Sequence, residues 1–237
     1  MIRTLSPLFA GVALVALSAA PGVAQQARVD LDDPERPEED RLRDEFSKPL
    51  AMLEWAGLEE GDVALDFHAG AGYNTWVLSE WVGPEGVVFT EMSGRRAEAL
   101  KERLATGDLA DAGNVVYVDA LAKVPDDTLD LFLTVRNYHD IPVDRIPEFL
   151  AGVERTLRPG GLFVVVDART DEGRDVDAHR IADEVIVEEV TAAGFELLGS
   201  SELLANPEDD HAGPRWERRE QVDQSLLKFR VPAEGGR

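Results

Sequence analysis

Three acidic residues stand where short apolar runs end, and the first of them leads into a pair of glycines. Asp66 precedes the turn Gly70-Ala71-Gly72, and Glu91 comes 19 residues after that turn. Glycines at this spacing let the backbone approach a ligand closely, and an acid about 20 residues further on can accept hydrogen bonds from both hydroxyls of a ribose. Asp119 ends the third run, where it can accept a hydrogen bond from an adenine amino group. The pattern indicates a nucleoside site.

Two histidines and two aspartates form a second group of reactive side chains. His139 and Asp140 follow the fourth apolar run, Asp167 ends the fifth, and His179 comes shortly afterwards. An imidazole that titrates near neutral pH can act as a general base, and Asp140 or Asp167 can orient it. We therefore predict catalytic roles for all four, while a structural cap of a strand-to-helix turn is an equal alternative for His139.

The same donors would also suit a divalent metal ion. Imidazole and carboxylate ligands favour Zn, Fe or Ni over Mg. The spacing of the four residues is long and unspecific, unlike that of a short helical metal motif, so we assign no metal ligand from the sequence.

Short apolar runs rich in valine, leucine and phenylalanine alternate with helical patterns along most of the chain. Such alternation is typical of a parallel sheet covered by helices on both faces. We expect strands at Val63–Phe67, Gly86–Thr90, Val115–Val118, Leu129–Val135 and Leu162–Asp167. We expect helices at Phe46–Gly57, Asn74–Trp81, Gly94–Leu104, Ile146–Leu157 and His179–Ala193.

The pattern changes after Gly194. Phe195–Ser201 and Ser225–Val231 both have the pattern of strands, and the connection between them is long and polar. We expect them to form an antiparallel pair that closes the sheet edge. The predicted fold class is α/β, a doubly wound, mostly parallel sheet with a C-terminal antiparallel strand pair. Open sheets of this kind bind ligands outside the carboxyl ends of their strands, at the topological switch point.

Two segments carry a resemblance to class I S-adenosylmethionine-dependent methyltransferases. Residues 63–73 look like the first motif of this family, and Leu157–Leu162 looks like the turn before its fifth strand. The likeness extends from about Phe46 to Pro232 and implies a Rossmann-like fold with S-adenosyl-L-methionine as the cofactor. It also implies that the methionine end of the cofactor faces Asp66 and the backbone of Gly70 and Gly72, with Glu91 on the ribose and Asp119 near the adenine.

A narrower likeness involves Asn137–Asp140, Val164–Asp167 and His179–Ile181. These segments resemble exported bacterial proteins identified from sequence as methyltransferases, and the likeness implies no particular substrate. The chain departs from the family at His68, where a small residue, most often glycine, is usual. We expect this imidazole to point away from the ligand and to pack or hydrogen-bond locally.

The first 45 residues differ in composition from the rest. Arg3 precedes an apolar run at residues 8–17 and small residues up to Ala24, which is the layout of a cleaved secretory signal peptide. Residues 25–45 are rich in aspartate, glutamate, arginine and proline. We therefore expect a signal peptide at 1–24, an acidic, poorly ordered arm at 25–45 and one methyltransferase-like domain at 46–237, in a periplasmic or secreted protein.

The net charge of the chain limits which partners it can bind. The 237 residues carry 47 acidic against 24 basic side chains, a formal net charge of -23, and no cysteine. This charge repels phosphate backbones, so we expect no nucleic-acid partner, and we expect no stable membrane insertion after signal cleavage. The predicted function is S-adenosylmethionine-dependent methyl transfer to a small-molecule substrate. The open alternatives are an exported, non-catalytic ligand-binding protein and a metal-assisted enzyme on the same scaffold.

Overall fold

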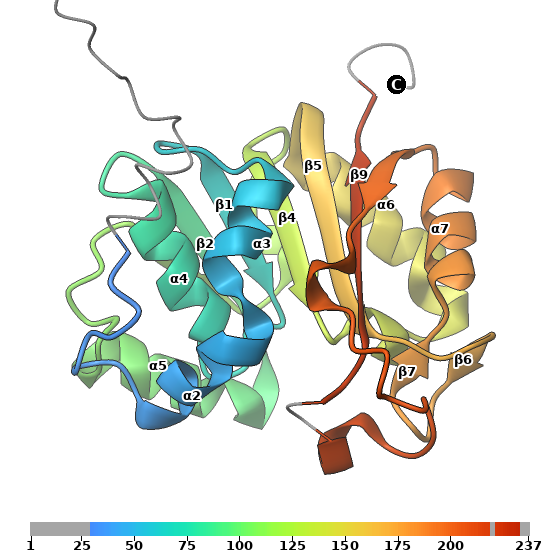
Figure 1. Ribbon diagram of the computed structural model, residues 1–237. Helices are drawn as coiled ribbons and strands as arrows, with labels where there is room; N and C mark the ends of the chain where they lie inside the picture. Colours follow the sequence, from blue (N-terminus) through green and yellow to red (C-terminus); the bar gives the residue numbers. More distant parts are fainter. Residues whose placement is uncertain (1–28, 219–220, 233–237) are drawn as a thin grey trace, which may run out of the picture.

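The computed structural model describes residues 29–218 and 221–232 (Figure 1). The signal peptide expected at residues 1–24 lies outside these ranges. The described residues form a seven-stranded sheet in the order β3-β2-β1-β4-β5-β9-β8. Its strands are β1 (Val63–Phe67), β2 (Val87–Glu91), β3 (Val115–Val118), β4 (Leu129–Val135), β5 (Leu157–Ala168), β8 (Glu196–Ser200) and β9 (Gln224–Arg230).

Strands β1 to β5 are parallel, and the last two strands are not. β1 pairs with β2 and β4, β2 with β3, and β4 with β5, all in the parallel sense. β9 is antiparallel to both β5 and β8. The strand order reverses between β1 and β4, so the carboxyl ends of these two strands flank the topological switch point. The predicted fold class, with its C-terminal antiparallel pair, is confirmed.

Helices cover both faces of the sheet because alternate strand residues point to opposite sides. Leu131 and Leu133 pack into one core with α3 (Pro49–Ala56), α4 (Tyr73–Val82) and α5 (Ala97–Thr106). Phe132, between them, packs into a second core with α6 (Ile146–Thr156) and α7 (Asp183–Ala192). Two separate apolar cores therefore hold the sheet rigid and fix the ends of its strands.

Proline and glycine set several helix boundaries. Pro49 occupies the first turn of α3, where its missing N–H costs no helical hydrogen bond, and Gly57 ends the helix in the left-handed conformation at φ 87°. None of the helices in the described ranges has the length and apolar composition needed to cross a membrane.

The structure differs from the prediction of a poorly ordered arm before Phe46. Glu38–Ser47 forms a helix, α2, which Figure 1 shows next to α5. Three acids in its first turn favour the helix N-terminus. Ion pairs hold it in place, Asp40 with Arg103 at 2.7 Å and Arg36 with Asp44 at 2.7 Å. Because charged contacts rather than an apolar stripe fix α2, hydrophobic periodicity does not reveal it.

A second difference concerns His179, which does not begin a helix. The chain first forms a small hairpin of β6 (Arg174–Asp175) and β7 (Arg180–Ile181), and α7 begins only at Asp183. Asp183 and Glu184 lie in the first turn of α7, where the helix dipole favours acids. Figure 1 shows this hairpin and α2 at the same end of the molecule, to either side of the sheet's carboxyl edge.

Candidate functional site

Asp66 is buried at the end of β1, inside a chain of hydroxyl groups. The Thr75 hydroxyl donates to its carboxylate at 2.7 Å and lies 2.8 Å from the Thr90 hydroxyl. Burial raises the pKa of Asp66 to about 6, and the Thr75 hydrogen bond opposes this shift. This carboxyl group therefore changes its charge within the range in which proteins commonly work.

Glu91 is buried at the end of β2, beside the loop that follows β1. Its carboxylate accepts a hydrogen bond from the His68 backbone N–H at 3.3 Å, and burial raises its pKa. The His68 ring stacks on Phe67 with centroids 4.4 Å apart and lies 3.7 Å from Glu91. The imidazole thus packs locally, as expected, but it does so next to the predicted ribose acid. Asp119 is exposed after β3, and its hydrogen bond from Lys123, at 2.7 Å, lowers its pKa.

Both glycines of the loop have left-handed backbones, and Gly72 also lies against a neighbouring helix. A Cβ on Gly70 would meet no atom within 4 Å, and its φ of 61° favours glycine on conformational grounds alone. A Cβ on Gly72 would lie 2.8 Å from the Leu100 side chain of α5. The Gly72 N–H donates to the Ala69 carbonyl at 2.9 Å. Gly72 therefore allows α5 to pack closely, while Gly70 leaves open space beside the loop.

Arg43, which α2 brings to this loop, was not among the residues predicted from the sequence. Its guanidinium lies 3.9 Å from the ring centroid of Tyr73, in the first turn of α4. Burial lowers the pKa of Arg43, and nearby acids that include Asp66 oppose that shift. The Tyr73 hydroxyl donates to Asp44 of α2 at 2.7 Å, which ties the helix to the loop. Polar residues of α2 at helical spacing, Asp40, Arg43, Asp44 and Ser47, were the signal available in the sequence.

The four predicted catalytic residues come together at the ends of β4 and β5. His139 and Asp167 are fully buried, and the His139 Nδ1 lies 2.6 Å from an Asp167 oxygen. His139 Nε2 lies 3.1 Å from Nδ1 of His179 and 3.4 Å from Oδ1 of Asp140. His179 Nδ1 lies 2.8 Å from the same Asp140 oxygen. Residues from three separate segments thus meet in one cluster.

Asp167 sets the protonation pattern of this cluster. Its Oδ2 accepts from the His139 backbone N–H at 2.9 Å, and its Oδ1 accepts from the Ala168 N–H at 2.8 Å. A carboxylate only accepts, so the hydrogen-bond network assigns the ring proton of neutral His139 to Nδ1. Nε2 is then left with a free lone pair that points toward Asp140 and His179.

The turn that carries His179 is held by its neighbours. His179 has a left-handed backbone at φ 55°, and its ring meets the Trp216 ring edge-on at 5.0 Å. The next residue, Arg180, is fully buried and donates two hydrogen bonds to Asp209, at 2.9 and 3.1 Å. Arg174 donates to the carbonyls of Tyr138 and His139 at 2.9 and 3.0 Å. These contacts fix the hairpin against the end of β4.

Arg136 lies between the loop and the cluster and was also missed by the sequence analysis. It directly follows β4 with a left-handed backbone at φ 59°. Burial lowers its pKa to about 9, and the positive charges of Arg43 and Arg215 act in the same direction. Arg136, Arg43 and Arg215 therefore lie close enough to influence one another, beside the acids at the carboxyl edge of the sheet.

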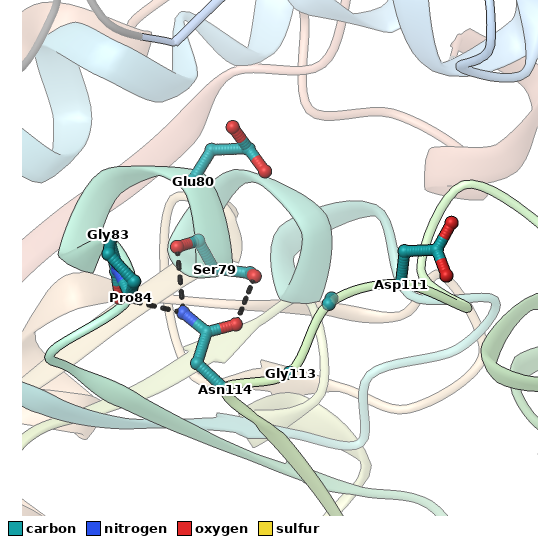
Figure 2. Close-up of a pocket in the computed structure, with 8 residues that line it drawn as sticks. Ser79, Glu80, Gly83, Pro84, Asp111, Gly113 and Asn114 are labelled. Atoms are coloured by element: carbon teal, nitrogen blue, oxygen red, sulfur yellow. Dashed lines mark hydrogen bonds between the residues drawn. The ribbon is translucent and has the colours of Figure 1, made fainter.

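A pocket at the opposite edge of the sheet has a structural explanation. Figure 2 shows Asn114 joining α4 to the start of β3, with its amide nitrogen donating to the carbonyls of Ser79 and Gly83 at 3.0 and 2.9 Å. The Ser79 hydroxyl donates to the Asn114 amide oxygen at 2.6 Å. Asn114 and Gly83 precede β3 and β2, so this pocket lies at the amino ends of the strands, away from the acids and histidines.

Comparison with known proteins connects this geometry to a family. A family model of protein-L-isoaspartate(D-aspartate) O-methyltransferases matches residues 46–126. A methyltransferase of Aquifex aeolicus described as S-adenosylmethionine-dependent superposes with a TM-score of 0.63 at 19% identity, over 90% of this chain and 100% of the other. The chain has the fold of class I S-adenosylmethionine-dependent methyltransferases. Fibrillarin of Aeropyrum pernix, solved with natively bound S-adenosyl-L-methionine, has a similar structure, with a TM-score of 0.52 at 16% identity over 76% of this chain and 73% of fibrillarin.

Two curated relatives share sequence with this methyltransferase-fold chain. Protein-L-isoaspartate O-methyltransferase of Ignicoccus hospitalis is 31% identical over 115 residues, which are 48% of this chain and 51% of the relative. The ubiquinone/menaquinone biosynthesis C-methyltransferase UbiE of Paracoccus denitrificans is 30% identical over 121 residues, 49% of this chain and 46% of the relative. The chain thus spans about half the length of the curated relatives it matches. The cofactor expected from the sequence is the one bound in fibrillarin of Aeropyrum pernix, which shares this fold.

Proposed function

We propose that the protein transfers the methyl group of S-adenosyl-L-methionine to a small-molecule acceptor. The observation that carries this proposal is the position of two groups at one edge of the sheet. The acids at the ends of β1 and β2 lie on one side of the switch point, and the His139–Asp167 pair lies on the other. A nucleoside held by the first group can present its reactive end to the second.

The polar groups near the glycine loop match the charges of the cofactor's methionine end. That end carries an ammonium and a carboxylate group. Asp66 supplies negative charge for the ammonium, while Arg43 and Arg136 supply positive charge for the carboxylate. The buried Glu91 carboxylate stands at the end of the next strand, where a ribose would lie.

The His139–Asp167 pair suits an acceptor that must lose a proton. The acceptor's nucleophilic atom forms a bond to the methyl carbon as the sulfonium–methyl bond breaks, which releases neutral S-adenosylhomocysteine. His139 Nε2 takes the acceptor's proton, and Asp167 holds the ring and stabilises the imidazolium. Both side chains are fully buried, and access runs past the partly exposed Asp140 and His179, which favours a small acceptor. The name of the matched family implies a protein acceptor instead. Transfer of a labelled methyl group to protein would support that alternative.

Calorimetric titration with S-adenosyl-L-methionine and S-adenosylhomocysteine tests the cofactor assignment. We expect the wild type to bind both, and Glu91→Ala to bind about 10- to 100-fold more weakly, because losing hydrogen bonds to a charged acceptor costs about 1.5–3 kcal/mol. Glu98→Ala, which removes an exposed acid from α5, is the matched control and should bind like the wild type. If the wild type bound neither compound, the result would favour the alternative that the protein binds another ligand.

Cofactor affinity should fall at acidic pH because of Asp66. Its pKa of about 6 means that the carboxyl group is charged above pH 6 and neutral below it. Only the charged form attracts the cofactor's ammonium, so the affinity should drop as pH falls through 6, by up to about tenfold per unit. Asp66→Asn should bind weakly and lose most of this pH dependence. Equal pH profiles for the wild type and Asp66→Asn would show that Asp66 does not face the ammonium.

A further inference from the structure

We propose that His139, Asp140 and His179 bind a divalent first-row transition-metal ion. The three residues offer His139 Nε2, Asp140 Oδ1 and His179 Nδ1, and these atoms lie 2.8, 3.1 and 3.4 Å from one another. Four ligands at about 2.0–2.1 Å around a tetrahedral ion lie about 3.3 Å apart. The triangle therefore has nearly the size of one face of such a coordination shell.

Proton counting supports an ion at the centre of the triangle. Asp167 assigns the His139 ring proton to Nδ1, so Nε2 is an acceptor, as is the Asp140 carboxylate. His179 Nδ1 lies within hydrogen-bond distance of both acceptors, and in the tautomer with the ring hydrogen on Nε2 it adds a third lone pair to the group. A cation would satisfy all three lone pairs at once.

The surroundings of His139 fit a metal ligand. Histidine ligands usually donate their second ring N–H to a carboxylate or carbonyl, which orients the ring and makes the coordinating nitrogen more basic. Asp167 accepts that proton at 2.6 Å and is itself held by two backbone N–H groups. Asp167 is therefore a positioning residue for the site.

The donor set identifies the class of metal. Two imidazoles and one carboxylate suit Zn²⁺, Co²⁺ or Ni²⁺, whereas Mg²⁺ prefers oxygen ligands and water. Three protein ligands leave a coordination position open, as in catalytic rather than structural zinc sites. Binding of the metal does not depend on the proposed function. The role of the metal in catalysis does depend on the proposed function. An acceptor oxygen bound at the open position would lose its proton more easily, and His139 would then act as a ligand instead of a base.

A second histidine provides a matched control. His211 Nδ1 lies 2.7 Å from Asp171, and its Nε2 lies 3.1 Å from Asp223. Each ring nitrogen faces its own carboxylate, so the three side chains do not converge on one point. His211→Ala removes a histidine with two acidic neighbours but leaves the proposed site intact.

Titration of the metal-depleted full chain with Co²⁺ tests the site. Calorimetry gives the stoichiometry, and visible absorption reports the ligand field. Tryptophan fluorescence, to which Trp216 beside the His179 ring contributes as one of four tryptophans, gives a further signal. Excess Mg²⁺ and salt suppress binding to the acidic surface. We expect one Co²⁺ per chain in the wild type and in His211→Ala. His179→Ala and Asp140→Asn should bind more than about 100-fold more weakly, since loss of even an outer partner costs about 10- to 100-fold.

His179 and Asp140 are partly exposed, so their variants are expected to fold, which circular dichroism would check. Equal Co²⁺ affinity in the wild type and both variants would overturn the proposal, as would an absence of stoichiometric binding by the wild type. The titration contains no S-adenosyl-L-methionine. Metal binding without cofactor binding would thus disprove the proposed function alone, and cofactor binding without metal binding would disprove this inference alone.

Discussion

His139→Ala is expected to lower methyl transfer by about 10²- to 10⁴-fold, the usual contribution of a general base. The side chain is fully buried, and its Nε2 faces the open side of the cluster. The cofactor contacts proposed above come from β1, β2, α2 and Arg136 after β4, and not from His139, so affinity for S-adenosyl-L-methionine should stay within about twofold of the wild type. Single-turnover rates at saturating cofactor, together with calorimetry, would separate the two effects.

The variant should keep its fold, because Asp167 still accepts from the His139 and Ala168 backbone N–H groups. Loss of the third hydrogen bond should cost about 1.5–3 kcal/mol, as for other bonds to charged groups. Elemental analysis then distinguishes the two roles of His139. Loss of both activity and bound metal identifies a ligand, and loss of activity in a metal-free wild type identifies a base. Full activity of the variant on a confirmed substrate would leave His139 with neither role.

The sheet was predictable from the sequence because parallel strands buried on both faces are continuous apolar runs. The bounds expected for β1, β3 and β4 agree with the structure. β5 begins at Leu157 rather than at the expected Leu162. The pairing register with β4 shifts between Leu129 and Leu131, so β5 includes the segment around Gly160 that was expected to be a turn. The predicted strand ends also gave the positions of Asp66, Glu91 and Asp167, because the carboxyl ends of neighbouring parallel strands lie at one edge of the sheet.

The missed parts of the site depend on charged contacts between distant residues. α2 is fixed by Arg36, Asp40 and Asp44, and no apolar period marks such a helix, so Arg43 was placed in an unstructured arm. The place of His179 was also unpredictable, since the buried partner of its neighbour Arg180 lies in the polar connection after β8. Nothing local in the sequence identifies Asp209 as that partner. Long-range ion pairs therefore set the geometry that strand patterns alone leave open.

Asp209→Ala should lower the free energy of unfolding by about 3–5 kcal/mol, the usual cost of removing one partner from a buried ion pair. The Arg180 guanidinium is fully buried, and without Asp209 its acceptors among the described residues would be the carbonyls of Arg169 and Gly213. Asp209 also accepts from the Asp223 backbone N–H at 2.8 Å, which would lose its partner as well. Urea unfolding of the full chain would measure the loss.

The matched control is Glu196→Ala, which breaks the exposed pair with Arg230 and should cost less than about 1 kcal/mol. The double variant Arg180→Met/Asp209→Leu should recover much of the stability, because replacing both charges with apolar groups removes the uncompensated charge. Equal stability losses for Asp209→Ala and Glu196→Ala would mean that water reaches Arg180 and that the pair is not buried in solution.

If the pair is buried, Asp209→Ala should also loosen the turn before Arg180 and weaken Co²⁺ binding through His179. Arg180→Met/Asp209→Leu should restore the metal affinity along with the fold.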